Sequence, residues 1–163
     1  MARKGSWGVR RRGARLAAVQ AMYQMEIAGK SSAEAIEDFR LRRISEIIDG
    51  EEAVTPENVD EDLFASLIDG VSASGSRLDA LIEQAISKER SLGGIEVLLR
   101  LILRAGAFEL SERSDIDAPL SINEYVAVAE AFFGGTEPRF VNGVLDRLAR
   151  VLSSTKATGD APE

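Results

Sequence analysis

The stretch Ile95-Glu-Val-Leu-Leu-Arg-Leu-Ile-Leu-Arg-Ala-Gly-Ala-Phe-Glu-Leu110 decides the fold. Its apolar side chains fall on almost every side of a helix, whereas a helix on the surface of a protein keeps one polar face. Its charged residues are Glu96, Arg100, Arg104 and Glu109. A bilayer needs about 20 predominantly apolar residues in succession. The stretch therefore predicts a central helix that is wrapped by other helices, and not a membrane span.

The rest of the chain shows the three- and four-residue apolar spacing of amphipathic helices. We expect helices over about residues 13–28 and 32–49, a third from Pro56 to about residue 73, a fourth over about 78–86, the central helix, a sixth over about 121–133 and a seventh from Pro138 to about 152. No alternation of period two is long enough to indicate a sheet. The sequence predicts an all-α bundle of about seven helices.

Two local signals bear on where these helices begin and how they pack. Ser121 and Glu124 have the spacing of a capping box, in which each side chain accepts a backbone N–H at a helix start. This predicts that residues 115–119 are a connector. Gly143 lies inside the last helix, where glycine costs about 1 kcal/mol relative to alanine. We expect it to allow the close approach of a neighbouring helix or of a nucleic-acid backbone.

The sequence contains no cysteine and no histidine. Their absence removes thiolate nucleophiles, the usual general base at neutral pH and the commonest ligands of transition metals. We therefore expect no enzymatic activity, no metal site and no cofactor. The basic N-terminus is not followed by the apolar segment of a secretory signal. A cytoplasmic protein without membrane contacts is expected.

The charges are distributed unevenly along the chain. The formal net charge is −7, yet six of the twenty basic residues and none of the acidic ones fall within residues 1–15. Arg10, Arg11, Arg12 and Arg15 lie at the start of the first expected helix. Guanidinium groups there are suited to contacts with successive phosphates of RNA or another polyanion. Two other interpretations stay open: a solubilising tail, or arginines that neutralise the acidic body of the same chain.

A second informative segment is Arg139-Phe-Val-Asn-Gly-Val-Leu-Asp146, at the start of the last helix. Its aliphatic residues continue the apolar stripe and are expected in the core. Phe140 is either a core residue or, beside Arg139, an exposed ring that stacks on an unpaired base. Asn142 is expected either to cap the helix or to contact a base edge.

Three blocks of the chain resemble the NusB family. They are Arg10–Tyr23, Ile102–Leu110, and the Ile122-Asn-Glu124 motif followed by Phe140-Val-Asn-Gly-Val-Leu-Asp146. The resemblance covers about residues 10–152. It implies an all-α fold of two packed subdomains. It also implies a transcription antitermination factor that binds the single-stranded boxA element of nascent ribosomal RNA transcripts. Its partner would be the ribosomal protein NusE, within an antitermination complex on RNA polymerase.

The resemblance also implies roles for particular residues. The RNA surface would include the arginines of the first helix (Arg10, Arg11, Arg12 and Arg15) and Phe140, and Tyr23 would lie on the side of the protein partner or in the core. The chain departs from the family pattern where Gly13 interrupts the arginine run and where Phe108 stands in place of a tyrosine.

These observations predict a domain organisation and leave alternatives. Residues 1–9 are expected to form a flexible basic arm, residues 10–152 the helical RNA-binding domain, and residues 153–163 a disordered tail. One alternative is a helical adaptor that binds proteins but no RNA. A second is a stand-alone module related to the NusB-like domain of ribosomal RNA methyltransferases. A hydrolase based on carboxylates such as Glu124 and Glu130 is a third.

Overall fold

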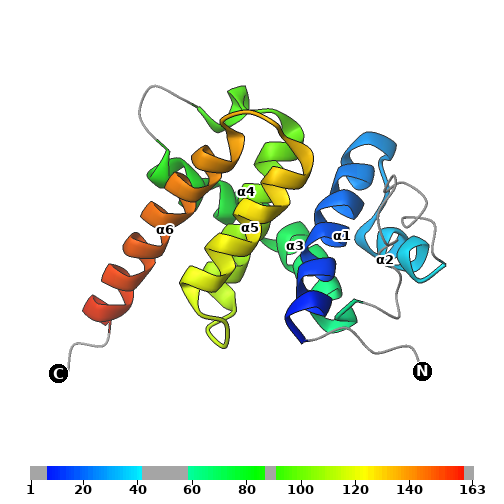
Figure 1. The fold of residues 1–163 in the computed structure, drawn as a ribbon, viewed down its shortest axis with the longest axis horizontal. Coiled ribbons are helices and arrows are strands. Elements are labelled where there is room, and N and C mark those ends of the chain that lie inside the picture. The colour runs from blue at the N-terminus through cyan, green and yellow to red at the C-terminus, as the bar shows by residue number, and fades with distance from the viewer. Residues whose placement is uncertain (1–6, 42–58, 87–90, 160–163) are drawn as a thin grey trace. The chain divides into compact units, whose positions relative to one another are not determined.

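The computed structural model of the protein describes residues 7–41, 59–86 and 91–159, with side chains as far as residue 155. Over these ranges every regular element is a helix (Figure 1). The elements are α1 (Trp7–Ala28), α2 (Ser32–Arg40), α3 (Glu61–Ala85), a 3-10 turn (Leu92–Gly94), α4 (Val97–Glu112), α5 (Ala118–Phe132) and α6 (Glu137–Gly159). The predicted all-α fold is confirmed, with six α-helices in the described residues against about seven expected. The chain divides into two compact units, the first ending at Ala73 and the second beginning at Ser74.

The first unit contains α1, α2 and the first half of α3. An alanine-rich face of α1 lies in its core, with Ala14, Ala17, Ala18 and Ala21 fully buried. Small side chains on this face let α1 pack closely against its neighbours. Phe39 of α2 stacks on Phe64 of α3 with ring centroids 4.2 Å apart. Gly29, at a φ of 66°, ends α1 in the left-handed conformation that glycine adopts most readily.

Helix α1 begins at Trp7, six residues before the start expected at Gly13. Arg11 follows Trp7 by one helical turn, and its guanidinium lies over the Trp7 ring at 4.3 Å from the ring centroid. This cation–π contact between residues four apart supports the first turns of the helix. The expectation of a flexible arm over residues 1–9 is therefore wrong for residues 7–9, and residues 1–6 lie outside the described residues.

Helix α3 continues through the Ser74-Gly-Ser76 segment, where a break between two helices was expected. The segment produces a kink, because Ser74 alone has non-helical backbone angles, with φ −117° and ψ 19°. The boundary between the two units coincides with this kink. Asp60 caps the helix by accepting a hydrogen bond from the Leu63 N–H at 3.0 Å.

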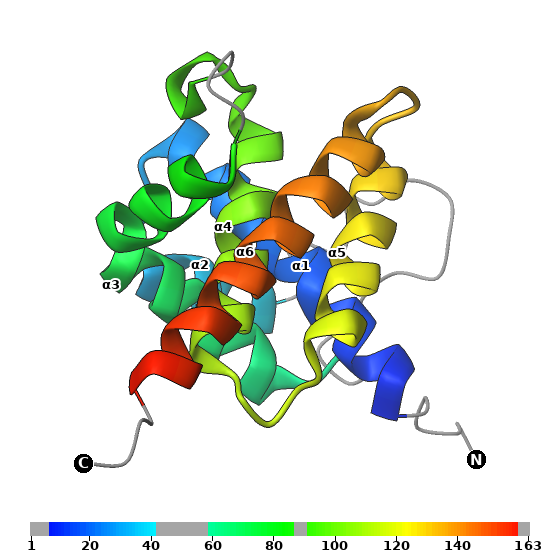
Figure 2. The ribbon, with the colours of Figure 1, turned by 90° about the vertical axis from the view of Figure 1, so that its left-hand side faces the viewer.

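In the second unit α4 packs against both α5 and α6, which also pack against each other (Figures 1 and 2). The prediction of a buried central helix is confirmed for this unit, since Leu101, Ile102 and Leu103 are almost fully buried. Gly106 is where α4 meets α6: a Cβ atom there would lie 2.7 Å from Leu145 Cδ1. On another side of α4, Arg104 donates two hydrogen bonds to Asp79 of α3, at 2.7 and 2.8 Å.

The predicted capping box is wrong. Helix α5 begins at Ala118, with Asp117 as its N-cap and a proline in its first turn, so Ser121 and Glu124 already lie inside it. Proline fits the first turn because its missing N–H would have no helical partner there. The Ser121 hydroxyl instead donates to Glu109 Oε1 of α4 at 2.9 Å, and the Tyr125 hydroxyl donates to Glu109 Oε2 at 2.7 Å. Two hydroxyl groups thus solvate a fully buried carboxylate.

The ends of two other helices also differ from the expectation. Helix α2 ends at Arg40 with its cap at Leu41, and the remainder of the predicted helix over residues 32–49 lies outside the described residues. Helix α6 continues to Gly159 and so includes residues 153–159, where a disordered tail was expected. Residues 160–163 lie outside the described residues.

Candidate nucleic-acid interface

The arginines at the start of α1 differ in their surroundings. Arg10 Nη2 donates to the Val59 carbonyl at 3.3 Å, and the Arg10 carbonyl accepts from the Asp60 N–H at 3.1 Å. Arg11 Nε lies 3.5 Å from Asp60 Oδ2 while its guanidinium covers Trp7. Both side chains are half-buried. Arg10 and Arg11 of α1 therefore bind the two residues that precede α3, Val59 and Asp60.

Arg12 and Arg15 are opposites in exposure. Arg12 is exposed, whereas Arg15 is among the largest fully buried side chains, with 1% of its surface accessible. The sequence predicted that both, with Arg10 and Arg11, contact successive phosphates of RNA. The structure does not gather them for such contacts, because a phosphate cannot reach Arg15 in this conformation. The exposed cation at this helix start is Arg12.

The start of α6 holds Phe140 at a cavity. The cavity has a volume of about 530 Å³ and is lined by Ser91, Gly94, Ile95, Glu96, Leu99, Thr136, Glu137 and Phe140. Phe140 is half-buried, so it is neither a pure core residue nor a fully exposed ring. The aliphatic residues Ile95 and Leu99 add apolar surface to the lining of this cavity. The cavity is within the size range of small-molecule sites.

Arg139 and Asn142 line a second cavity on another side of the same helix start. This cavity, of about 670 Å³, lies between the end of α5 and the start of α6 and includes Phe133, the Gly134-Gly135 turn and Thr136. Thr136 belongs to both cavities. Arg139 and Asn142 are exposed. Asn142 lies inside α6, so the expected alternative that it caps this helix is wrong.

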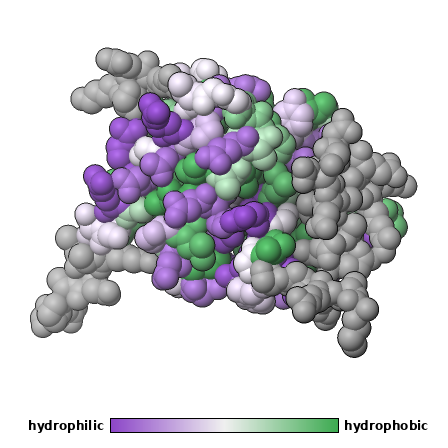
Figure 3. Space-filling view, in the orientation of Figure 1, coloured by the Kyte–Doolittle hydropathy of each residue, from purple (hydrophilic) through white to green (hydrophobic). Residues whose placement is uncertain are grey.

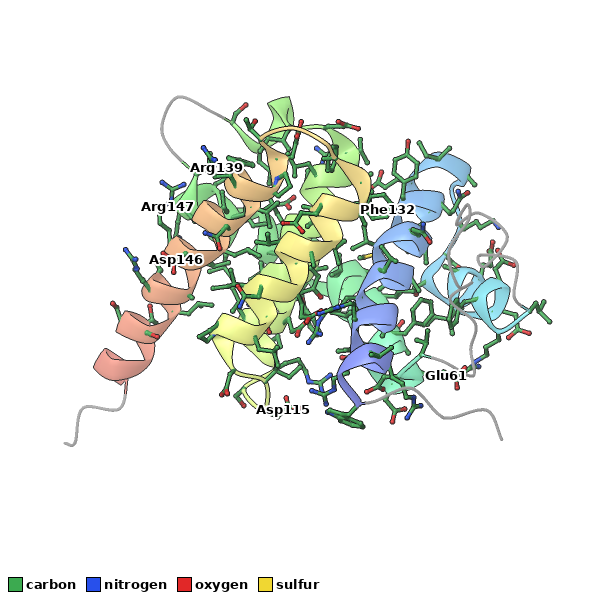
Figure 4. All side chains as sticks on the ribbon, viewed as in Figure 1. Glu61, Asp115, Phe132, Arg139, Asp146 and Arg147 are labelled. Carbon is green, nitrogen blue, oxygen red and sulfur yellow. The ribbon has the colours of Figure 1, made fainter. Side chains whose placement is uncertain are left out.

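Besides Arg139, further polar residues that the sequence did not indicate as site residues lie along the outer side of α6, among them Arg147 and Arg150. Arg139, Asp146 and Arg147 project from this side, away from α5 (Figure 4). The space-filling view shows strongly hydrophilic side chains over the same part of the surface (Figure 3). Arg150 pairs with Asp146 at 2.9 Å and is itself largely exposed. The helical spacing of Arg139, Arg147 and Arg150 is the sequence pattern that indicates this polar side of α6.

Gly143 does not provide the close packing expected of it. A Cβ atom there would have only the Arg147 guanidinium within reach, at an ordinary contact distance of 3.7 Å. The tight approach of α4 and α6 occurs at Gly106 instead. The outer side of α6 therefore carries no side chain at Gly143, between Arg139 and Arg147.

Tyr23, the expected partner residue, is half-buried on α1. Among the described residues its hydroxyl group has no hydrogen-bond partner.

The described parts of the chain lack both the ligand cluster of a metal site and a membrane-spanning helix. Those parts contain no cluster of three or more carboxylate, histidine or cysteine side chains that could hold a metal ion. Nor is any helix within them long and apolar enough to cross a membrane.

Over its described residues the chain belongs to the class of all-helical proteins built of two units, with exposed arginines at the starts of α1 and α6 and an aromatic ring at a cavity. The family model described as NusB family matches residues 12–150. The chain belongs to the NusB family of transcription antitermination proteins.

Curated relatives and a solved structure agree with this assignment. The chain is 44% identical to the transcription antitermination protein NusB of Allorhizobium ampelinum over 84% of each chain. It is 43% identical to that of Sinorhizobium fredii over 85% of each chain, and 42% identical to that of Bartonella tribocorum over 88% of this chain and 90% of the relative. The solved structure of T. maritima NusB superposes with a TM-score of 0.64 at 27% identity, covering 85% of this chain and 89% of that one.

Proposed function

We propose that this protein promotes antitermination by binding the boxA element of nascent ribosomal RNA transcripts together with the ribosomal protein NusE. The observation that carries the RNA part is the start of α6. There an exposed arginine and a half-buried phenylalanine adjoin two cavities that share Thr136. A cation beside an aromatic ring is the combination that binds the backbone and the bases of a single strand.

The structure supports a division of roles among the predicted RNA-binding residues. Arg12 and Arg139 are exposed and are assigned to phosphates. Phe140 is assigned to stacking on a base, and Asn142 to a base edge. Arg10, Arg11 and Arg15 are assigned to positioning, because their side chains are partly or fully buried.

The charge of the protein supports a requirement for a partner. A net charge of −7 opposes the approach of RNA. A basic ribosomal protein would lower this repulsion and would itself be attracted to an acidic surface. We assign Tyr23 to that contact. In this proposal the protein acts in the cytoplasm as a binding component of a complex on RNA polymerase, without catalysis and without a cofactor.

The test is a titration of a short boxA RNA with the protein, with and without NusE, at several salt concentrations. Each phosphate contact on a single strand contributes about −0.7 to the slope of log affinity against log salt. Arg12→Ala and Arg139→Ala should each flatten the slope by about that amount. Phe140→Ala should lower the affinity with little effect on the slope, since stacking on one base contributes about 1–3 kcal/mol.

Arg77→Ala is the matched control. Arg77 is about as exposed as its partner Glu112, to which it donates a hydrogen bond at 2.8 Å. Replacing Arg77 with alanine changes the net charge of the protein by the same amount as replacing Arg139. If Arg77→Ala weakens binding as much as Arg139→Ala, the effect is one of total charge and the assigned site is refuted. If no RNA binds in any condition while NusE still does, the protein is an adaptor between proteins.

A further inference from the structure

Glu137, the first residue of α6, carries one carboxylate oxygen that no described residue satisfies. Its Oε2 atom is buried and has no hydrogen-bond partner among the described residues. That oxygen lies over Gly135, where a Cβ atom would be only 2.8 Å away. Buried polar atoms are almost always hydrogen-bonded, so an orphan of this kind requires an explanation.

Glu137 also lines the cavity that holds Phe140. The cavity thus offers an aromatic ring, aliphatic surface from Ile95 and Leu99, and an acceptor group from Glu137. Unpaired bases are recognised in proteins by stacking on a ring combined with hydrogen bonds to the edge of the base. The cavity presents both elements within one site.

The chemistry of a carboxylate determines which base it favours. An ionised carboxylate only accepts hydrogen bonds, and its two oxygens can accept from two neighbouring donors. Guanine presents adjacent N–H donors on its pairing edge, and cytosine and adenine each present an amino group. Uracil presents one N–H group between two carbonyl oxygens, which a carboxylate repels.

We propose that Glu137 selects the base that stacks on Phe140, favouring guanine and disfavouring uracil. This inference rests on the RNA binding proposed above and adds a specificity-determining residue to it. Neither the charge nor the exposure of Arg139 distinguishes one base from another, whereas an acceptor at the edge of the stacked base does.

The test uses short RNAs that are identical except at one position, which carries guanine, adenine, cytosine or uracil in turn. The position is the one at which base replacement has an effect in the wild type and none in Phe140→Ala. There the wild type should prefer guanine over uracil by on the order of tenfold, the discrimination expected of a bidentate contact. Glu137→Gln should reduce this ratio severalfold, because an amide can donate to the uracil carbonyl as well as accept.

Glu83→Gln is the matched control. Glu83 of α3 is exposed and lines neither cavity, and its substitution removes the same charge. It should leave the ratio between guanine and uracil unchanged. Glu137→Asp keeps the carboxylate and should retain the direction of the preference.

The outcomes separate the two proposals. An unchanged ratio in Glu137→Gln, or an equal loss in Glu83→Gln, overturns the role of Glu137 and leaves RNA binding intact. Failure of every RNA to bind the wild type in the presence of NusE overturns both. Circular dichroism of each variant establishes that the fold is retained.

Discussion

Replacing Gly106 with alanine should destabilise the second unit, although alanine is the better helix former. The new Cβ atom would lie 2.7 and 2.9 Å from the two methyl carbons of Leu145. Carbon atoms in contact normally lie about 3.5–4.0 Å apart. Leu145 is fully buried, so its methyl groups move only by displacing other core side chains. Such overpacking costs about 1–3 kcal/mol.

Gly143→Ala isolates this packing cost from the effect of helix propensity. Both glycines lie inside helices of the same unit, and both gain about 1 kcal/mol of propensity on becoming alanine. At Gly143 the added atom has only an ordinary contact, at 3.7 Å from the Arg147 guanidinium. Gly143→Ala should therefore be more stable than the wild type. We expect Gly106→Ala to be less stable than Gly143→Ala by about 1–3 kcal/mol.

The assay is urea unfolding followed by far-ultraviolet circular dichroism. The free energy of unfolding is extrapolated to zero urea, and the slopes are compared to establish that each variant unfolds from the same state. If Gly106→Ala proves as stable as Gly143→Ala, Leu145 gives way at no cost. In that case the inference that Gly106 fixes the approach of α4 and α6 is refuted.

Three further predictions concern side chains whose environments differ sharply. Tyr125→Phe removes a hydroxyl that donates to the buried Glu109 carboxylate, and should lower the free energy of unfolding by about 1.5–3 kcal/mol in the same urea assay. Arg15→Ala should lower the melting temperature while Arg12→Ala leaves it unchanged, because only the first side chain is buried; equal melting temperatures would contradict this. Trp7 is the one tryptophan and is 61% exposed, so its fluorescence should change when RNA binds at the start of α1. An unaltered spectrum in the saturated complex would place the RNA elsewhere.

The helices were predictable from the sequence because their apolar spacing is a local property. Their ends were less predictable, since one short pattern fits more than one position in a helix. Ser121 and Glu124 have the spacing of a capping box, yet α5 already begins at Ala118. Two features oppose the capping box: the proline in the first turn of α5, and the buried Glu109 of α4, which accepts a hydrogen bond from the Ser121 hydroxyl. The contact with Glu109 is a tertiary effect, and no pattern around Ser121 indicates it.

The candidate site shows the same division. The sequence indicated the arginine cluster and Phe140, because charge and motif are visible without a structure. It did not indicate that Arg15 is buried while Arg12 is exposed. Nor did it indicate Glu137, whose significance lies in an unsatisfied oxygen over Gly135. Burial and missing partners depend on the packing of several elements, so they emerge only from the folded chain.

The kink at Ser74 has a consequence for how this chain tolerates changes in length. Leu63 and Leu67 precede the kink and Leu78 and Ile82 follow it, and each pair is buried in the core of its own unit. Because an α-helix has 3.6 residues per turn, one inserted residue rotates everything after it by about 100°. An insertion or a deletion within either pair would turn one of its buried side chains toward water. We expect relatives to keep the number of residues between these positions constant, and to vary in length at connections such as the Gly134-Gly135 turn.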